Sequence, residues 1–210
     1  MNMTDIKRDI FSASDVGLAR TRNEDACGVA DTPNGVVCVV CDGMGGHAGG
    51  DIAAQIAVEC IIRHLNREVY ADLRQALHEA LEFANLQIIG AASENPALQG
   101  MGATACVLLL QERQAWIAHA GDSRIYLYEP VKQRLHRLTR DHSYVQGLVE
   151  QGMITEAEAE THPNRNRILK ALGTSENLNA EICAKAIQPA NGVIFLVCSD
   201  GLSGMVADRV

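Results

Sequence analysis

The apolar residues of this sequence follow two different spacings. Val36–Cys41 is an unbroken apolar run, which is typical of a β-strand covered on both faces. In residues 52–65 and again in residues 73–88, apolar side chains recur every three or four positions, which predicts two amphipathic helices in succession. Ahead of these helices, Ile10–Ser14 and Cys27–Ala30 are predicted to be short strands.

The strand pattern returns after Ser93. The expected strands are Thr104–Leu110, Ala115–Ala120 and Arg124–Tyr128, arranged as a meander, followed by the fully apolar Val193–Cys198. Short helices are expected at Ser143–Glu150 and Glu156–Glu160.

Strands and helices thus form separate blocks, which favours an α+β fold with antiparallel sheets over alternating βαβ units. Because strands that are apolar on both faces need cover on each side, we expect a four-layer α/β/β/α sandwich. Its two antiparallel sheets would lie in the middle, flanked by helices. The sequence has no repeat, low-complexity tract or Pro-rich linker, so residues 1–210 are expected to form a single domain.

The composition excludes several classes of protein. Lys and Arg number 18 against 26 Asp and Glu, and the formal net charge of −8 disfavours binding to nucleic acid or to anionic lipid. No apolar stretch approaches the roughly 18 residues of a membrane span, and residues 1–9 lack the apolar core of a secretory signal. We therefore expect a cytoplasmic protein without a membrane partner.

The cysteines agree with that location. There are seven, an odd number, and most lie inside apolar runs, which is typical of buried reduced thiols. Cys38 and Cys41 have the spacing of a CxxC motif, but positions i and i+3 of a strand face opposite sides of the sheet. A metal or redox role for this pair is therefore disfavoured.

Candidate chemistry lies where predicted strands end. Asp42, Asp122 and Asp200 each stand beside a glycine just after a strand, where the simplest interpretation of each one alone is a turn. Asp42 and Asp200, however, follow strands without a polar residue, which should be central strands. Central strands that end at one edge would bring the carboxylates together. Because such carboxylates repel unless a cation neutralises them, the pattern favours a hard cation such as Mg²⁺ or Mn²⁺.

A charged loop, Gly17–Asp25, precedes the strand expected at Cys27–Ala30. The loop holds two arginines, Arg20 and Arg22, together with the carboxylates of Glu24 and Asp25. It is either a solvated surface loop or a place where an arginine binds an anion beside a carboxylate-bound cation. The second interpretation is chemically reasonable because a guanidinium fork matches a phosphate group.

Taken together, these motifs resemble those of the metal-dependent PP2C-type (PPM) serine/threonine protein phosphatases in their bacterial form. The resemblance runs from about Ile10 to the last residue, and seven segments occur in the family's order. They are GLARTRNED at 17–25, VVCDGMGGHAGG at 39–50, GMGAT at 100–104, AGDSRIY at 120–126, LTRDHS at 138–143, HPNRNRILKALG at 162–173 and FLVCSDGL at 195–202.

The resemblance implies a complete set of site residues. The implied metal ligands are Asp42, which bridges two ions, the Gly43 carbonyl, Asp200, Asp122 at a further acidic position, and Glu24, which acts through a held water. The implied catalytic residues are Arg20, which holds the substrate phosphate, with Glu24, Asp25 and Asp42. The implied cofactors are two or three Mn²⁺ or Mg²⁺ ions, which activate a water for attack on phosphoserine or phosphothreonine. Phosphorylated proteins, and a bacterial Ser/Thr kinase or its targets, are the implied partners.

Two departures from the family pattern stand out. Met44 occupies the position where many eukaryotic members carry a histidine after Asp-Gly, which leaves the general acid open between His47 and a metal-bound water. The sequence also has no Asp-Asn dipeptide, which normally closes the family's dimetal site, and Gly204 stands where many members carry another acidic ligand. We therefore expect the closing elements to be missing from residues 1–210.

Three other functions were weighed. No cysteine is followed by an arginine six positions later, which excludes the loop of the cysteine phosphatases. Gly43-x-Gly45-x-x-Ala48 fits a dinucleotide-binding fingerprint, but the next element after its helix is a second helix rather than a strand. A catalytically incomplete phosphatase-like module that binds phosphoproteins or other partners stays open as the alternative to an active enzyme.

Overall fold

The computed structural model describes residues 9–18, 20–45, 49–206 and 208. Its strands are β1 (Asp25–Thr32), β2 (Gly35–Met44), β3 (Gly102–Ala103), β4 (Ala105–Gln111), β5 (Gln114–Ala120), β6 (Arg124–Glu129), β7 (Arg134–Arg137), β8 (Glu181–Ile182) and β9 (Ile194–Cys198). Its α-helices are α1 (Gly50–Leu65), α2 (Leu73–Glu94), α3 (Tyr144–Glu150), α4 (Glu156–Thr161) and α5 (Asp200–Ser203), with a 3₁₀ turn at Pro96–Leu98.

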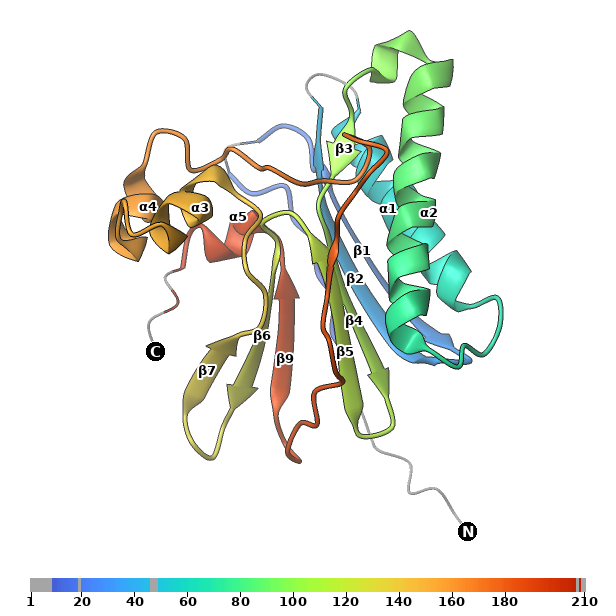
Figure 1. Ribbon diagram of the computed structural model, residues 1–210, viewed down its shortest axis with the longest axis vertical. Coiled ribbons are helices and arrows are strands. Elements are labelled where there is room, and N and C mark those ends of the chain that lie inside the picture. Colours follow the sequence, from blue (N-terminus) through green and yellow to red (C-terminus); the bar gives the residue numbers. More distant parts are fainter. Residues whose placement is uncertain (1–8, 19, 46–48, 207, 209–210) are drawn as a thin grey trace.

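The strands form two antiparallel sheets (Figure 1). One face of each sheet packs against a shared cluster of apolar side chains. The larger sheet has the order β1-β2-β4-β5-β8, with β3 paired to β2, and the smaller has the order β7-β6-β9. Every pairing is antiparallel. The predicted α+β class with two antiparallel sheets is therefore confirmed.

Helices α1 and α2 cover one face of the larger sheet (Figure 1). The two apolar stripes expected from the sequence are buried there, with Ala53, Ala57, Leu77 and Leu81 fully enclosed. Helix α2 begins at a capping aspartate, Asp72, whose carboxylate accepts hydrogen bonds from the main-chain N–H groups of Arg74 and Gln75. This helical layer holds β2 and β4 in place and so fixes the edge at which the acidic residues lie.

The two faces of β2 contact different cores. Val37, Val39 and Cys41 pack against the helices, whereas Cys38 packs against the cluster of apolar residues between the two sheets. The cysteines of the CxxC spacing thus lie on opposite faces, as predicted. None of the seven cysteines, all of which lie within the described residues, forms a disulfide.

Three details of the predicted fold were wrong. Ile10–Ser14 forms no strand in the described part of the chain, since no strand lies beside it to complete its backbone hydrogen bonds. Strand β6 does not continue the meander of β4 and β5. At Gly121 the chain adopts a φ of 111°, which glycine tolerates, and it then passes into the smaller sheet.

Strand β9 is the third correction, because it lies at the edge of the smaller sheet rather than at its centre. Its apolar run is only partly covered, and Ile194 and Leu196 are 56% and 43% exposed. Short helices α3, α4 and α5 gather at one end of this sheet (Figure 1). No helix among the described residues has the length and apolar character needed to cross a bilayer.

Candidate active site

Strand directions bring three acidic turns to one end of the two sheets. Strands β2 and β5 run in the same direction because each pairs antiparallel with β4, so Asp42 and the turn that carries Asp122 reach the same edge. The start of β6 pairs with the end of β9, with Arg124 opposite Cys198. The residues next to that pair therefore include both Asp122 and Asp200. The three aspartates therefore lie at one edge, and two sheets supply them rather than the single sheet edge that the sequence suggested.

The carboxylates are close enough to shift one another's protonation. Burial raises the pKa of Asp42 to about 8, with further contributions from the charges of Asp200 and Asp25 and from a hydrogen bond with Asp200. Burial also raises the pKa of Asp122 to about 7, helped by the charges of Asp200 and Asp141. Without a cation, these groups can approach one another only by retaining protons.

One oxygen of this group has no hydrogen-bond partner. Oδ1 of Asp122 is buried and unpaired among the residues that the structure describes. A buried carboxylate oxygen without a donor is costly, and a bound cation would remove that cost. The donors at this edge are carboxylate and carbonyl oxygens, the set that Mg²⁺ and Mn²⁺ prefer. The residues present therefore fit the divalent ions that the sequence predicts.

A threonine holds two of the acidic turns together. The main-chain N–H of Asp42 donates to Thr104 Oγ1 at 2.9 Å, and the N–H of Thr104 donates to the Asp42 carbonyl oxygen at 2.8 Å. The Thr104 hydroxyl lies 2.7 Å from the hydroxyl of Ser123, the residue after Asp122. Sequence analysis placed Thr104 in the GMGAT segment without assigning it a role. The structure identifies it as the link between two strands of the larger sheet and the turn into β6.

Asp25 and Glu24 join β1 to the same edge. Asp25 lies opposite Asp42 in the β1–β2 pairing, and its Oδ2 accepts a hydrogen bond of 2.7 Å from Ser199 Oγ. The carbonyl oxygen of Glu24 accepts a hydrogen bond of 3.0 Å from the N–H of Gly43. The Glu24 carboxylate lies against Gly50, where a Cβ atom would stand 2.7 Å from Oε1. Glu24 thus approaches the first residue of α1, where a negative charge is favourable.

The two arginines of the charged loop differ in how strongly each is held by a carboxylate. Arg22 donates to Asp51 Oδ2 at 2.7 Å and is thereby tied to the first turn of α1. Arg20 is 77% exposed, and its Nη1 lies 3.6 Å from Oε2 of Glu24. An exposed ion pair of this length is weak and easily exchanged for a better anion. Arg20 is therefore the arginine available to a ligand beside the carboxylates.

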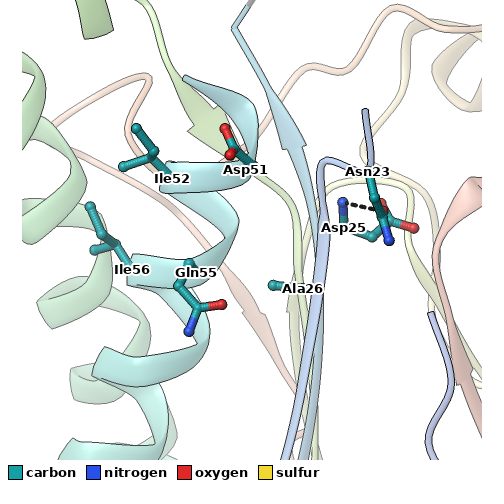
Figure 2. A pocket seen from close by; sticks show the side chains of 7 residues that line it. All are labelled: Asn23, Asp25, Ala26, Asp51, Ile52, Gln55 and Ile56. Carbon is teal, nitrogen blue, oxygen red and sulfur yellow. Dashed lines mark hydrogen bonds between the residues drawn. The ribbon is translucent and has the colours of Figure 1, made fainter. Parts of the chain in front are cut away.

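An open groove of about 430 Å³ begins at Asp25. Figure 2 shows Asn23 and Asp25 on the side of β1, and Asp51 and Gln55 on the first turns of α1. The Asn23 side chain accepts a hydrogen bond of 3.1 Å from the main-chain N–H of Asp25. The groove lies between α1 and β1, and of the clustered aspartates only Asp25 lines it.

Three further positions singled out in the sequence are Met44, His47 and Gly204. Met44 is the last residue of β2, and His47 lies outside the described residues. Gly204 ends α5 and donates its N–H to the Asp200 carbonyl oxygen at 2.7 Å. A Cβ atom at Gly204 would lie 2.7 Å from that same oxygen, so the glycine allows the short helix to close.

A pair of charged residues missed by sequence analysis braces the Asp122 turn. Arg124 donates to both carboxylate oxygens of Asp141, at 2.8 Å from Nη2 and 3.1 Å from Nε. Arg137 also contacts Asp141, at 2.9 Å. Such a two-point guanidinium–carboxylate contact is geometrically demanding and fixes the first residue of β6. A sequence signal for it was present in the AGDSRIY and LTRDHS segments, which contain Arg124 and Asp141.

Comparison with known proteins gives consistent matches. The family model described as protein phosphatase 2C matches residues 19–210. The serine/threonine protein phosphatase PstP of Mycobacterium tuberculosis is 35% identical over 196 residues, which are 93% of this chain. The chain spans only 36% of the length of that relative.

Solved structures agree with the sequence matches. The serine/threonine phosphatase Stp1 from Staphylococcus aureus superposes with a TM-score of 0.84 at 35% identity, covering 93% of this chain and 77% of that one. The catalytic domain of PstP, solved in complex with two manganese ions, has a TM-score of 0.80 at 33% identity, covering 93% of this chain and 79% of that one.

Proposed function

Because this chain belongs to the protein phosphatase 2C family, we propose that it is a metal-dependent phosphatase that hydrolyses phosphoserine and phosphothreonine in proteins. The observation that carries the proposal is the group of carboxylates Asp25, Asp42, Asp122 and Asp200 at one end of the sheets. Their mutual repulsion requires either protons or a divalent cation. The names of the relatives support the substrate class, since they are serine/threonine phosphatases.

We propose that two Mn²⁺ or Mg²⁺ ions are held by Asp42, the Gly43 carbonyl and Asp200, with Asp122 at a further position and Glu24 acting through a water. When bound, such ions lower the pKa of a water molecule and neutralise charge on the phosphoryl oxygens. Asp42 and Asp122 must release their protons to serve as ligands, because both have raised pKa values in the metal-free chain. Metal affinity should therefore fall as the pH is lowered.

Other residues position the reacting groups. Thr104 holds the backbone of Asp42, and Ser199 orients the carboxylate of Asp25 through its 2.7 Å hydrogen bond. The exposed guanidinium of Arg20 would exchange its contact with Glu24 for the substrate phosphate, a charge-assisted and geometrically matched interaction. Met44 carries no proton to donate, so we assign no general acid to the position after Gly43.

The test is hydrolysis of p-nitrophenyl phosphate and of a phosphothreonine peptide by the purified chain, with and without divalent ions. We expect turnover with Mn²⁺ or Mg²⁺ and none after exhaustive chelation. Asp42→Asn should lower turnover by more than about tenfold, which is about 1.4 kcal/mol of barrier. Asp31→Asn, which removes an exposed carboxylate at the far end of β1, is the matched control and should keep full activity.

Activity that survives chelation, or that requires zinc specifically, would contradict the dimetal proposal. The alternative, a module that binds phosphoproteins without hydrolysing them, predicts phosphopeptide binding but no turnover with any divalent ion. We further propose that the substrates include a bacterial Ser/Thr kinase or its targets. We also propose that the protein acts in the cytoplasm, where its seven cysteines, none of them in a disulfide, would stay reduced.

A further inference from the structure

Two histidines and a glutamate meet beside the turn that carries Asp122. His119 lies near the end of β5, and Glu181 on β8 is its cross-strand partner. The ring of His142 stacks on the ring of His119, with 4.6 Å between their centres. One potential ligand atom from each of the three residues lies within 4.8 Å of the other two. The proposed phosphatase chemistry uses none of these side chains.

The cluster contains polar atoms that the protein leaves unpaired or only weakly paired. His119 and His142 are only 2% and 6% exposed. Among the described residues, Nδ1 of His119 is buried without a hydrogen-bond partner, and Nε2 of His142 has only the long contact with Glu181 Oε2, at 3.5 Å. Buried ring nitrogens are normally paired, because leaving one desolvated and unpaired is costly. An unpaired nitrogen and a long histidine–carboxylate contact in one cluster point to a ligand that would pair with all three groups.

The protonation states of the two histidines indicate which kind of ion the cluster can bind. Burial, together with the nearby His142 and Lys170, lowers the pKa of His119 to about 3. Burial also lowers the pKa of His142. Both imidazoles are therefore neutral at pH 7, so metal binding need not displace a proton from an imidazolium. Two neutral imidazoles and one carboxylate suit zinc and related transition metals better than Mg²⁺.

We propose that His119, His142 and Glu181 bind one transition-metal ion of the zinc class, at a site separate from the carboxylates that hold the catalytic ions. Tetrahedral zinc at about 2.0–2.1 Å from its ligands sets them roughly 3.3 Å apart, so the present cluster must contract modestly. Glu181 can supply that movement because its side chain is 47% exposed. Glu181 has two competing contacts, with His142 Nε2 at 3.5 Å and with Arg140 at 3.8 Å, and both are long and therefore weak.

A metal ion bound at this site would remove the hydrogen bond between His142 and Gly121, the residue before Asp122. The N–H of Gly121 donates to Nδ1 of His142 at 3.2 Å, which places the proton of the neutral ring on Nε2. To ligate a metal through Nε2, the ring must carry its proton on Nδ1 instead, and it can then no longer accept from Gly121. Metal binding and this hydrogen bond therefore exclude each other. A bound ion would loosen the turn that carries Asp122.

The binding test uses Zn²⁺ alone as the probe, in competition with a chromogenic chelator and with excess Mg²⁺ present to fill the carboxylate site. We expect one Zn²⁺ per chain, and an affinity that falls about tenfold or more in His119→Gln and in Glu181→Gln. His78→Gln, which changes an exposed histidine of α2, is the matched control and should bind as the parent does. Glu181 lies at the surface, so its variant tests the proposal even if a buried histidine variant does not fold.

An affinity for Zn²⁺ that is unchanged in Glu181→Gln and His119→Gln would overturn the site, as would Zn²⁺ that Mg²⁺ displaces stoichiometrically. The tautomer change has its own readout in the ring ¹⁵N shifts of His142, which should move the proton from Nε2 to Nδ1 when Zn²⁺ is added. An unchanged tautomer in the zinc-bound protein would overturn the link to Gly121.

The effect on catalysis rests on the proposed function. If that function holds, Zn²⁺ should slow Mn²⁺-supported turnover in the parent and in His78→Gln but not in Glu181→Gln. Equal inhibition of all three would overturn the coupling. A chain without phosphatase activity under any condition would refute the proposed function instead, while the direct Zn²⁺ titration would still decide the metal site.

Discussion

Replacement of Asp42 by asparagine should stabilise the metal-free protein and destabilise it relative to the parent once Mn²⁺ is present. Asp42 has an ordinary pKa of 3.8 but a pKa of about 8 in the folded chain, because burial and the charges of Asp200 and Asp25 oppose its ionisation. Between pH 4 and 8 the unfolded chain therefore releases a proton that the folded chain keeps. Folding stability falls as the pH rises through that window.

The magnitude follows from the size of the shift. One pH unit corresponds to about 1.4 kcal/mol, so the interval from 3.8 to pH 7 gives an upper limit of roughly 4 kcal/mol. Because Asp42 is only partly buried, solvent screening reduces this to about 1–2 kcal/mol. At roughly 2–4 °C per kcal/mol for a chain of this size, Asp42→Asn should melt about 2–8 °C higher than the parent.

The assay is thermal unfolding in a chelating buffer at pH 7.5 and at pH 5, followed by the same melts in Mn²⁺. The gain from Asp42→Asn should be largest at pH 7.5 and shrink at pH 5, where the parent suffers less repulsion. In Mn²⁺ the parent should overtake the variant, because only the parent retains its central ligand. Asp31→Asn controls for the loss of one negative charge. A variant that melts below the parent in chelator at pH 7.5, or whose gain does not depend on pH, would refute the repulsion argument.

Three further outcomes are expected. Arg20→Ala should raise KM for a phosphopeptide and leave the Mn²⁺ affinity, measured by calorimetry, unchanged. Unaltered kinetics would show that Arg20 is a solvated surface charge without a role in substrate binding. Thr104→Val should lower the free energy of unfolding in urea by about 1–3 kcal/mol, because it leaves buried polar groups unpaired, and Thr104→Ser should restore most of the loss. Gly43→Ala should prevent folding or lower stability strongly, since its Cβ would overlap the Gly50 carbonyl oxygen. The matched control for Gly43→Ala is Gly147→Ala, where nothing lies within 4 Å of the added Cβ atom and the melting temperature should stay the same or rise slightly.

The sequence predicted those elements whose own periodicity decides their structure. The stripes of α1 and α2 are long, and each buries one face against the larger sheet, so the pattern and the packing agree. Strand β2 was equally clear, because an apolar run of that length is stable only between two layers.

The errors occurred where the choice of a partner decides the structure. Nothing in Arg124–Glu129 itself states whether that strand pairs with β5 or opens a second sheet. The decision lies in Gly121, whose positive φ turns the chain away, and in the pairing of β6 with β9, which is distant in sequence. Similarly, the apolar composition of Val193–Cys198 shows that the strand can be buried on both faces, but it does not show which elements cover those faces.

The same distinction separates the two candidate sites. Asp42, Asp122 and Asp200 could be predicted because each follows a strand at a glycine turn, which is a local signal that needs only the strands to end together. His119, His142 and Glu181 carry no such signal, because a histidine in a strand, one in a loop and an exposed glutamate are each unremarkable alone. They become a candidate metal site only through the β5–β8 register and the stacking of two rings. Furthermore, the property that links them to Asp122 is the position of one proton, set by the N–H of Gly121. Which ring nitrogen of His142 carries the proton depends on contacts that form only in the folded chain, so the structure is needed to identify it.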